Sequence, residues 1–202
     1  MNDYIIEQYE RDGYIVTLGY DTDPMNPRDW DHLGTMVCSH RDYELGDVQV
    51  SPYDDYPWEA PDGVAVLIPL GLYDHGGISM YAGGGNAVGD ADGWDSGTVG
   101  VIYCTKQDIV AWGLDGVKDE ADITDAIIDH AKTILLGEIE QYDQYLRGDV
   151  YYFMVEQRGE VCEHCGDEAD PEWIEYCYGF YDIEDARSEA ESFLPDVTAT
   201  TV

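Results

Sequence analysis

The stretch ITDAIIDHAKTILLGEIEQYDQYL, residues 123–146, decides the fold class. Apolar residues recur in it every three or four positions, which is the spacing of one face of an α-helix. They are Ile127, Ile128, Ala131, Ile134, Leu135, Ile139, Tyr142, Tyr145 and Leu146. Thr124 is a favourable N-cap residue, and Gly148 is a favourable stop. The spacing therefore predicts one long amphipathic helix, placed late in the chain.

Alternating and β-branched segments surround this helix and predict strands. These segments are 13–20, 33–39, 64–73, 78–82, 98–104, 150–157 and 173–181. A second helix is predicted over 182–193, and a short one begins at Thr105. Because strands outnumber helices and the long helix follows most of them, we expect an α+β fold. Its mainly antiparallel sheet should be accompanied by the long late helix and a C-terminal helix.

The chain has 202 residues, enough to bury the core of one domain. No internal repeat or linker divides it, so we predict a single domain over 1–194 and a frayed tail over 195–202. Segments 21–31 and 51–62 are rich in Pro and Asp and are predicted loops. The N-terminus lacks the regions of a signal peptide, and the longest apolar run, 64–73, is too short to span a bilayer. We therefore expect a soluble protein inside the cell, with no membrane contact.

Charge is the most unusual property of the composition. Asp and Glu number 44, Lys and Arg number 9, and the formal net charge at pH 7 is −35. Such a charge repels phosphate backbones and anionic membranes, so direct binding to nucleic acid is not expected.

Two explanations of the acidity stay open. One is halophilic adaptation, because at 1 M salt the Debye length falls to about 3 Å and self-repulsion is screened. The other is mimicry of DNA, with carboxylates occupying a phosphate-binding groove on another protein. The acids are spread along the whole chain and Lys occurs only three times, which favours salt adaptation.

The glycine-rich segment YAGGGNAVGDADGWDSG, residues 81–97, raises the question of a phosphate or calcium loop. It lacks the Gly-Lys-Ser/Thr end of a P-loop, and its aspartates would repel a phosphate. An EF-hand register that begins at Asp90 places Trp94 and Asp95 where a ligand and a glycine are required. We therefore interpret the segment as a hairpin loop.

Cys162-Glu-His-Cys165 is the clearest metal motif, because two thiolates at this spacing fit a tetrahedral zinc ion. Cys177 is a candidate third ligand across the hairpin that joins the last two strands. No fourth ligand is evident, since His164 lies inside the motif. A structural zinc site of Cys162, Cys165 and Cys177 and a pair of reduced thiols in an acidic turn both stay open. The other two cysteines fall in predicted strands and are interpreted as buried thiols.

The stretch NPRDWDHLGTMVCSHRDYELGD, residues 26–47, gathers four groups that can carry positive charge in a chain that has few of them. They are Arg28, His32, His40 and Arg41.

This stretch resembles a segment of a widespread family of small, functionally uncharacterised proteins carried by bacteriophages, archaeal viruses and mobile elements. Four further segments resemble the family in the same order: VLIPLGLYDHGGISM (66–80), WDSGTVGVIYCTKQDI (94–109), GEIEQYDQYLRGDVYYFMVE (137–156) and YCYGFYD (176–182). The chain departs from the family at His32, where Asn is usual, and the Cys162–Cys165 motif lies outside the shared segments. The resemblance implies a viral accessory role in an infected cell and brings no established activity with it.

The family-like segments carry charged, imidazole, hydroxyl and indole groups, whereas packing alone would favour aliphatic residues. These residues are Arg28, Trp30, Asp31, His40, Arg41, Asp74, His75, Trp94, Asp95, Ser96, Tyr142, Asp143 and Tyr145. We hypothesise that the 26–47 stretch, the strand end YDHGG (73–77) and the turn WDSG (94–97) converge on one concave polar site. There Arg28 and Arg41 would pair with Asp74, Asp95 or Asp143. The alternative, a buried ion-pair network that only fixes the loops, stays open.

Two function hypotheses follow. The first is a non-enzymatic viral accessory protein that binds a host or viral protein in the host cytoplasm, for example to counter a host defence. A strongly acidic surface suits partners that normally handle nucleic acid. The second is an enzyme acting on a nucleotide or nucleic acid, with His40, His75 and Asp95 as acid–base groups and Arg28 or Arg41 binding phosphate. Hydrolysis by a serine nucleophile is not favoured, because the chain has no GxSxG elbow.

Overall fold

The computed structural model of the chain describes residues 4–51 and 61–195. The chain divides into two compact units, which we call the central unit (Asn26–Arg147) and the terminal unit (Met1–Met25 with Gly148–Val202). No linker composition marks this boundary, and the prediction of one domain stays a prediction. The predicted loop at 51–62 and the predicted tail fall almost entirely outside the described residues.

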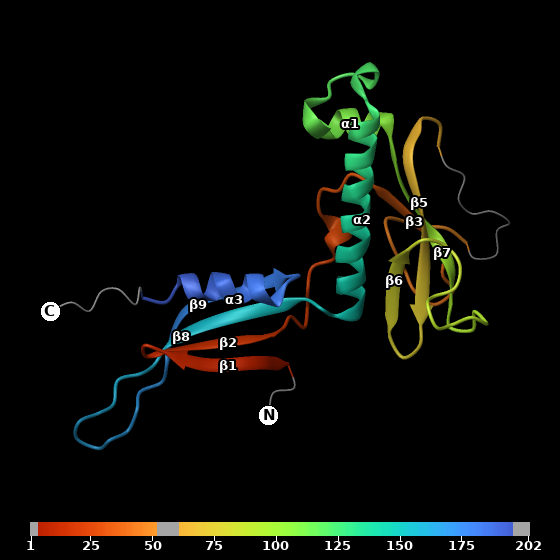
Figure 1. Ribbon diagram of the computed structural model, residues 1–202. Coiled ribbons are helices and arrows are strands. Elements are labelled where there is room, and N and C mark those ends of the chain that lie inside the picture. The colour runs from red at the N-terminus through yellow and green to blue at the C-terminus, as the bar shows by residue number, and fades with distance from the viewer. Residues whose placement is uncertain (1–3, 52–60, 196–202) are drawn as a thin grey trace. The chain divides into compact units, whose positions relative to one another are not determined.

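The central unit is built on a five-stranded sheet in the order β4-β3-β7-β5-β6. Figure 1 labels β3, β5, β6 and β7 of this sheet. Its strands are β3 (Thr35–Cys38), β4 (Val48–Gln49), β5 (Val64–Asp74), β6 (Ile78–Ala82) and β7 (Ser96–Thr105). Strands β3 and β4 pair parallel, and the other neighbours pair antiparallel.

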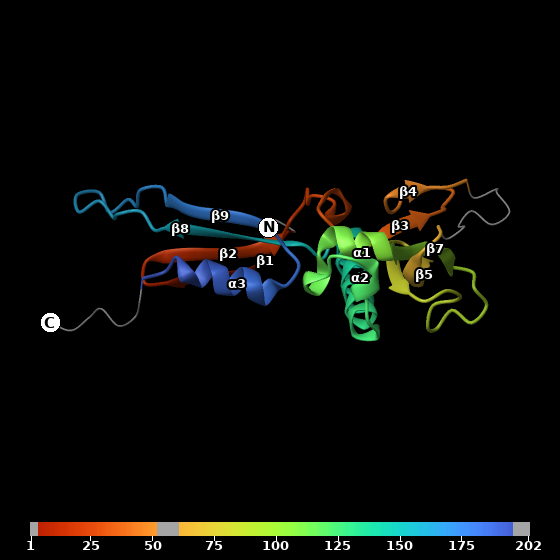
Figure 2. The ribbon, with the colours of Figure 1, turned by 90° about the horizontal axis from the view of Figure 1, so that it is seen from above.

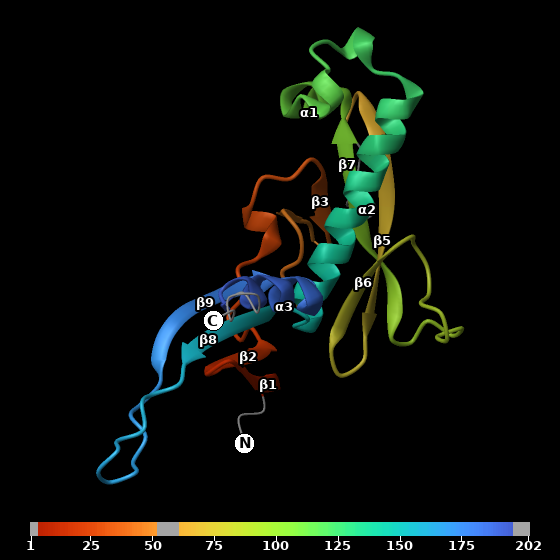
Figure 3. The same ribbon diagram turned by 60° about the vertical axis from the view of Figure 1, so that its left-hand side comes forward.

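Helix α2 (Asp125–Arg147) packs on this sheet (Figure 3). Its buried residues are Ala131, Leu135, Ile139 and Tyr142. They follow the predicted apolar spacing and join the strands in one hydrophobic core. The shorter helices of the unit are η1 (Pro27–Asp29), α1 (Lys106–Trp112), η2 (Leu114–Gly116) and η3 (Glu120–Asp122).

The terminal unit has a four-stranded antiparallel sheet in the order β1-β2-β8-β9. Its strands are β1 (Ile5–Arg11), β2 (Tyr14–Tyr20), β8 (Tyr151–Gln157) and β9 (Glu172–Phe180). Helix α3 (Ile183–Ser192) lies along one face of this sheet (Figure 2). Ala186 and Ala190 of α3 are fully buried in the core of this unit, together with Leu18 and Phe153 of the sheet.

The predicted α+β class is confirmed, as are the long late helix and the C-terminal helix. Strands β1 and β4 were not predicted. A turn with positive φ at Asp12 (54°) and Gly13 (81°) joins β1 to β2, and an Asp-Gly pair favours this kind of tight hairpin. Among the described residues, no helix is both long enough and apolar enough to cross a bilayer.

Candidate functional site

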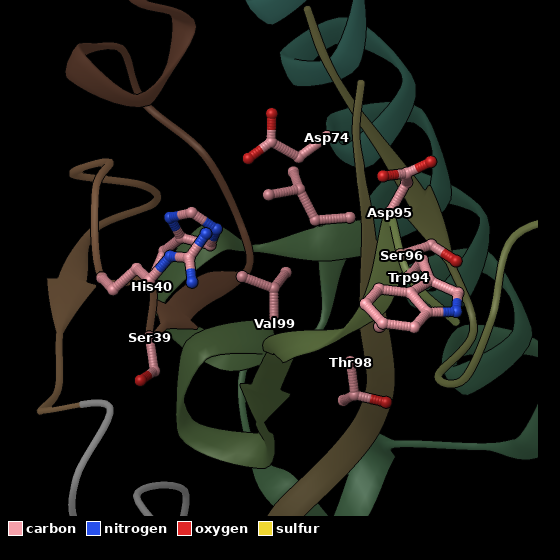
Figure 4. Close-up of a pocket in the computed structure, with 11 residues that line it drawn as sticks. Ser39, His40, Asp74, Trp94, Asp95, Ser96, Thr98 and Val99 are labelled. Carbon is pink, nitrogen blue, oxygen red and sulfur yellow. The ribbon is translucent and has the colours of Figure 1, made fainter. Parts of the chain in front are cut away.

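An open pocket of about 350 Å³ lies in the central unit, where β3 and β5 end and β7 begins. Its lining consists of Ser39, His40, Arg41, Leu72, Asp74, Trp94, Asp95, Ser96, Gly97, Thr98 and Val99. Figure 4 shows His40 on one side and Trp94, Asp95 and Ser96 on the other. The three sequence segments that we expected to converge therefore do meet at one concave site.

The turn 39–41 reaches this pocket because β3 pairs closely with β7. The backbone N–H of Ser39 donates a hydrogen bond to the carbonyl oxygen of Val99 (2.8 Å). A Cβ atom on Gly100 would lie only 2.1 Å from the carbonyl oxygen of Val37. A residue without a side chain is therefore required at Gly100 for the two strands to approach this closely.

Asp74 and Asp95 come together because the ends of two neighbouring strands are hydrogen-bonded. The backbone N–H of Asp74 donates to the carbonyl oxygen of Asp95 at 2.7 Å, and Tyr73 is the register partner of Ser96. Both carboxylates consequently line the pocket from adjacent strand ends (Figure 4).

The predicted hairpin loop between β6 and β7 is organised around Asp90. The Asp90 carboxylate accepts hydrogen bonds from Ser96 Oγ (2.6 Å), Asp95 N–H (3.1 Å) and Trp94 N–H (3.2 Å). These bonds, the one from Ser96 above all, hold the pKa of Asp90 below its usual value. The loop therefore presents Trp94 to the pocket from a defined backbone, although the indole is 87% exposed.

The opposite wall carries a histidine and an arginine. His40 stacks on Tyr43 with ring centroids 4.9 Å apart, and its Nδ1 accepts the backbone N–H of Asp42 (3.1 Å). The hydroxyl of Tyr43 reaches Asp74 at 3.5 Å. Arg41 donates from Nε to Asp42 at 2.7 Å, and its side chain is 75% exposed. The hypothesis that Arg41 also pairs with a carboxylate across the pocket stays a prediction.

His75 stands beside the pocket and contacts one of its carboxylates. Its Nδ1 lies 3.2 Å from Asp95 Oδ2, and the imidazole is largely exposed. Ser96, which follows Asp95 directly in sequence, donates to Asp90. The structure therefore contains a His75–Asp95 pair, but the Ser96 hydroxyl donates to Asp90 and is not placed as a nucleophile beside His75.

Arg28 does not reach the pocket. Its side chain is only 4% exposed. Nε and Nη2 donate to the two carboxylate oxygens of Asp47 (2.8 and 2.6 Å), and Nη1 donates to Glu138 (2.9 Å). Nη2 also donates to the carbonyl oxygen of Gly34 (2.7 Å). The hypothesis that Arg28 pairs with an aspartate of the pocket or with Asp143 is therefore wrong. The alternative, a buried ion-pair network, holds for this residue.

The network ties the start of β3 to α2. Glu138 of α2 also accepts the backbone N–H of Leu33 (2.8 Å), and Asp47 accepts that of Met36 (2.6 Å). Burial alone would lower the pKa of Arg28, but its hydrogen bonds to the two carboxylates outweigh burial and raise it. The guanidinium therefore stays charged and paired, with no free donor pair for a phosphate.

Tyr142, Asp143 and Tyr145 of α2 were predicted to belong to the site, but they do not line the pocket and instead contact neighbouring parts of the central unit. Tyr142 is buried, and its hydroxyl accepts the backbone N–H of Gly46 (3.0 Å). Burial raises the pKa of Tyr142 to about 12. Asp143 accepts the backbone N–H of Met80 (2.7 Å), which holds β6 on the helix, and Tyr145 stacks on Tyr142.

Trp30 and Asp31 also lie outside the pocket, in the exposed segment after η1. His32, which the sequence placed among the scarce cations, contacts the buried network: its Nδ1 lies 3.1 Å from Arg28 Nη2 and 2.9 Å from the carbonyl oxygen of Gly34.

The predicted three-cysteine zinc site is not brought together. In the described part of the chain, no group of three or more His, Cys, Asp or Glu side chains is placed to hold a metal ion. Cys177 packs against the core beneath α3, whereas Cys162 and Cys165 are exposed in the loop between β8 and β9. The two strand cysteines, Cys38 and Cys104, are buried as predicted.

The sequence analysis did not identify Glu138 in the buried ion-pair network, or Tyr43 and Asp90 at the pocket. Glu138 follows Ile134 and precedes Tyr142 on the apolar face of the predicted helix, and a carboxylate there indicates a buried cationic partner. Tyr43 and Asp90 gave no such signal, because Tyr and Asp are frequent throughout this chain.

Comparison of the chain with protein-family models, with curated proteins and with solved structures finds no match.

Proposed function

We propose that this chain is a viral accessory protein that acts by binding a host or viral protein, and that the pocket takes a cationic side chain of that partner. The viral setting and the host cytoplasm rest on the resemblance of five segments to the phage and archaeal-virus family. The binding mode rests on the chemistry of the pocket.

One observation carries the binding mode: the exposed indole of Trp94 lines a pocket together with the carboxylates of Asp74 and Asp95. The face of an indole attracts guanidinium and ammonium groups, and a carboxylate beside it accepts their hydrogen bonds. Tryptophan is also enriched among the residues that dominate binding energy at protein interfaces. A lysine or an arginine of a partner protein fits this combination.

The charge of the whole chain supports a basic partner. A net charge of −35 attracts cationic proteins over long distances at low ionic strength. In concentrated salt that attraction is screened beyond about 3 Å, so only groups in direct contact can distinguish one partner from another. The pocket supplies such contacts.

The test is affinity capture from a lysate of infected host cells in at least about 1 M KCl, where the Debye length is about 3 Å. The baits are the wild-type chain, the triple variant Trp94→Ala/Asp74→Asn/Asp95→Asn, and Trp173→Ala. Trp173 is a matched control because it is an exposed tryptophan of the terminal unit. We expect the wild type and Trp173→Ala to retain the same basic protein, and the triple variant to lose about tenfold or more of it.

Equal capture by the triple variant would contradict the proposal. It would favour DNA mimicry instead, in which carboxylates outside the pocket contact the basic partner. Loss of capture with Trp173→Ala alone would place the binding surface on the terminal unit.

The His75–Asp95 contact favours a second candidate, an acid–base enzyme acting on a nucleotide or nucleic acid. Two observations weigh against it: Arg28 is fully engaged, and a phosphate in the pocket would meet Asp74 and Asp95. An assay of nucleoside triphosphate and single-stranded DNA hydrolysis decides between the two. The enzyme requires turnover that His75→Gln abolishes, whereas the binding protein gives none.

A further inference from the structure

The loop between β8 and β9 ends in an exposed turn with the sequence Cys162-Glu-His-Cys165-Gly166 (Figure 1). Every residue from 160 to 174 is solvent-exposed. The turn is part of the terminal unit and is separate in sequence and in unit from the pocket described above.

Backbone hydrogen bonds give this turn a definite shape. The Cys162 N–H donates to the carbonyl oxygen of Asp167 (2.7 Å), and the Gly166 N–H donates to that of Cys162 (2.8 Å). Gly166 has φ +76°, the left-handed conformation in which glycine is favoured. Cys162 and Cys165 are therefore both part of one tight, exposed turn.

Cys162 and Cys165 stand in this turn at the two-residue spacing with which a pair of thiolates binds one tetrahedral zinc ion. Both side chains are exposed, so they are accessible to a metal ion and to ligands from another molecule. This pair is half of a tetrahedral sulfur site.

The other half is not found within the described part of this chain. A closed structural zinc site uses four nitrogen or sulfur ligands, and no third ligand is placed beside the two cysteines. Cys177 packs toward α3, and the nearby carboxylate of Glu168 is held by Arg158 through two hydrogen bonds. The residues outside the described ranges include no Cys or His.

We propose that the turns of two copies of this chain share one zinc ion, bound by Cys162 and Cys165 of each copy. The four thiols release four protons as Zn²⁺ binds, which gives a tetrathiolate site. Because each copy supplies the same two ligands, the assembly has two-fold symmetry and closes as a dimer. His164 lies between the two cysteines in sequence and stays outside the coordination sphere.

Acidic residues surround the turn, among them Glu160, Glu163 and Asp167, so two approaching copies repel each other at low ionic strength. Arg158 offsets part of this charge by pairing with Glu10 and Glu168. We therefore expect the dimer to form in molar salt, where the repulsion is screened.

The test uses the full-length chain, reduced and freed of metal, in about 1 M KCl, where the Debye length is about 3 Å. Light scattering coupled to size-exclusion chromatography follows its mass as Zn²⁺ alone is added. The expected result is a dimer with one zinc per two chains that reverts to monomer with a chelator. Co²⁺ in place of Zn²⁺ should give the visible absorption of a tetrahedral tetrathiolate site.

Variants separate the shared site from other causes of association. Cys162→Ser/Cys165→Ser should remain folded by circular dichroism, because both residues are exposed, and should neither bind zinc nor dimerise. Cys177→Ser and His164→Ala are the controls and should dimerise like the wild type. One zinc per monomer, a dimer that survives chelation or the double variant, or no zinc uptake at all would overturn the proposal.

Discussion

The guanidinium of Arg28 joins Asp47, from the segment that follows β3, to Glu138 of α2, and it does so from an almost fully buried position. Both carboxylates also accept backbone N–H groups near the start of β3. The Arg28 network thus fixes much of the 26–47 stretch to α2. A structural role therefore explains why this stretch contains Arg28, and no bound ligand is required. Arg41, in the same stretch, is exposed and lines the pocket.

Replacing Arg28 by Met should lower the free energy of unfolding of the chain by about 3–5 kcal/mol, because two partly buried carboxylates lose their partner. Chemical denaturation in molar salt measures the change. Arg41→Met is the matched control and should stay within about 0.5 kcal/mol, since the Arg41 side chain is 75% exposed and exposed ion pairs contribute little. A loss of less than about 1 kcal/mol for Arg28→Met would be that of a surface ion pair and would contradict the role assigned to the network.

Two buried thiols should make stability fall in alkali. Burial raises the pKa of Cys38 to about 12 and that of Cys104 to about 11, whereas an unfolded cysteine titrates near about 8.5. Because the folded state binds these protons more tightly, the stabilisation is complete below the unfolded pKa and is lost as the pH rises toward the folded values. Each thiol can contribute a slope of about 1.4 kcal/mol per pH unit in this window.

Urea unfolding at several pH values between about 8 and 10.5, around the unfolded thiol pKa, measures this slope. The variant Cys38→Ala/Cys104→Ala should be less stable at neutral pH but should show a shallower decline. Parallel declines in the variant and the wild type would assign the alkaline loss to other groups.

At the scale of elements, the pocket depends on strand ends that are fixed to one another. Asp74 N–H bonds to Asp95, Ser39 N–H bonds to Val99, and Asp90 holds the loop that carries Trp94. A flexible glycine-rich loop at this position would leave the indole unplaced. The proposed binding therefore requires the hydrogen bonds to Asp90, because they fix the backbone that carries Trp94.

Asp90→Ala should speed hydrogen exchange at the backbone amides of Trp94 and Asp95, because it removes their acceptor. Exchange measured by NMR or mass spectrometry reports the change. Asp92→Ala, an exposed aspartate in the same loop, should leave these amides unchanged. If both variants exchange alike, the loop is not held by Asp90.

The elements themselves were largely accessible from sequence. Strand β6 matches its predicted range, and α2 begins directly after Thr124, because long periodic segments bury one face whatever their partners are. Strand β1 was missed because most of its residues are exposed or charged and its alternation is weak.

The residues of the pocket were accessible only in part. His40, Arg41, Asp74, Trp94, Asp95 and Ser96 were nominated from their types and do line it. Their pairing was not accessible, because 44 carboxylates offer each arginine many equivalent partners in sequence. Which carboxylate meets which arginine is decided by strand register and by how α2 packs on the sheet.

At the scale of the whole molecule, the charge of −35 opposes folding at low ionic strength. Its acids are spread along the chain, and self-repulsion opposes compaction unless salt screens it. Each unit has a hydrophobic core of its own. The burial of apolar side chains in these cores stabilises the fold, and the repulsion between carboxylates opposes it.

Lowering the salt from about 2 M to about 10 mM, which lengthens the Debye length from under 3 Å to about 30 Å, should unfold the purified chain. Circular dichroism and tryptophan fluorescence follow the transition. Sucrose at equal osmolality is the control and should not replace the salt, since it screens no charge. A chain that stays folded at millimolar salt would argue against halophilic adaptation as the reason for the acidity.

We propose that the pocket of the central unit recognises a cationic side chain through Trp94, Asp74 and Asp95. The most direct measurement follows the tryptophan indole N–H signals by NMR while the peptide Ac-Gly-Arg-Gly-NH₂ is added in molar salt, with the same peptide carrying citrulline as the neutral control. We predict that the Trp94 signal, assigned with Trp94→Phe, shifts with the arginine peptide and that the Trp173 signal does not. An unmoved Trp94 signal, or an equal shift with citrulline, would contradict the claim.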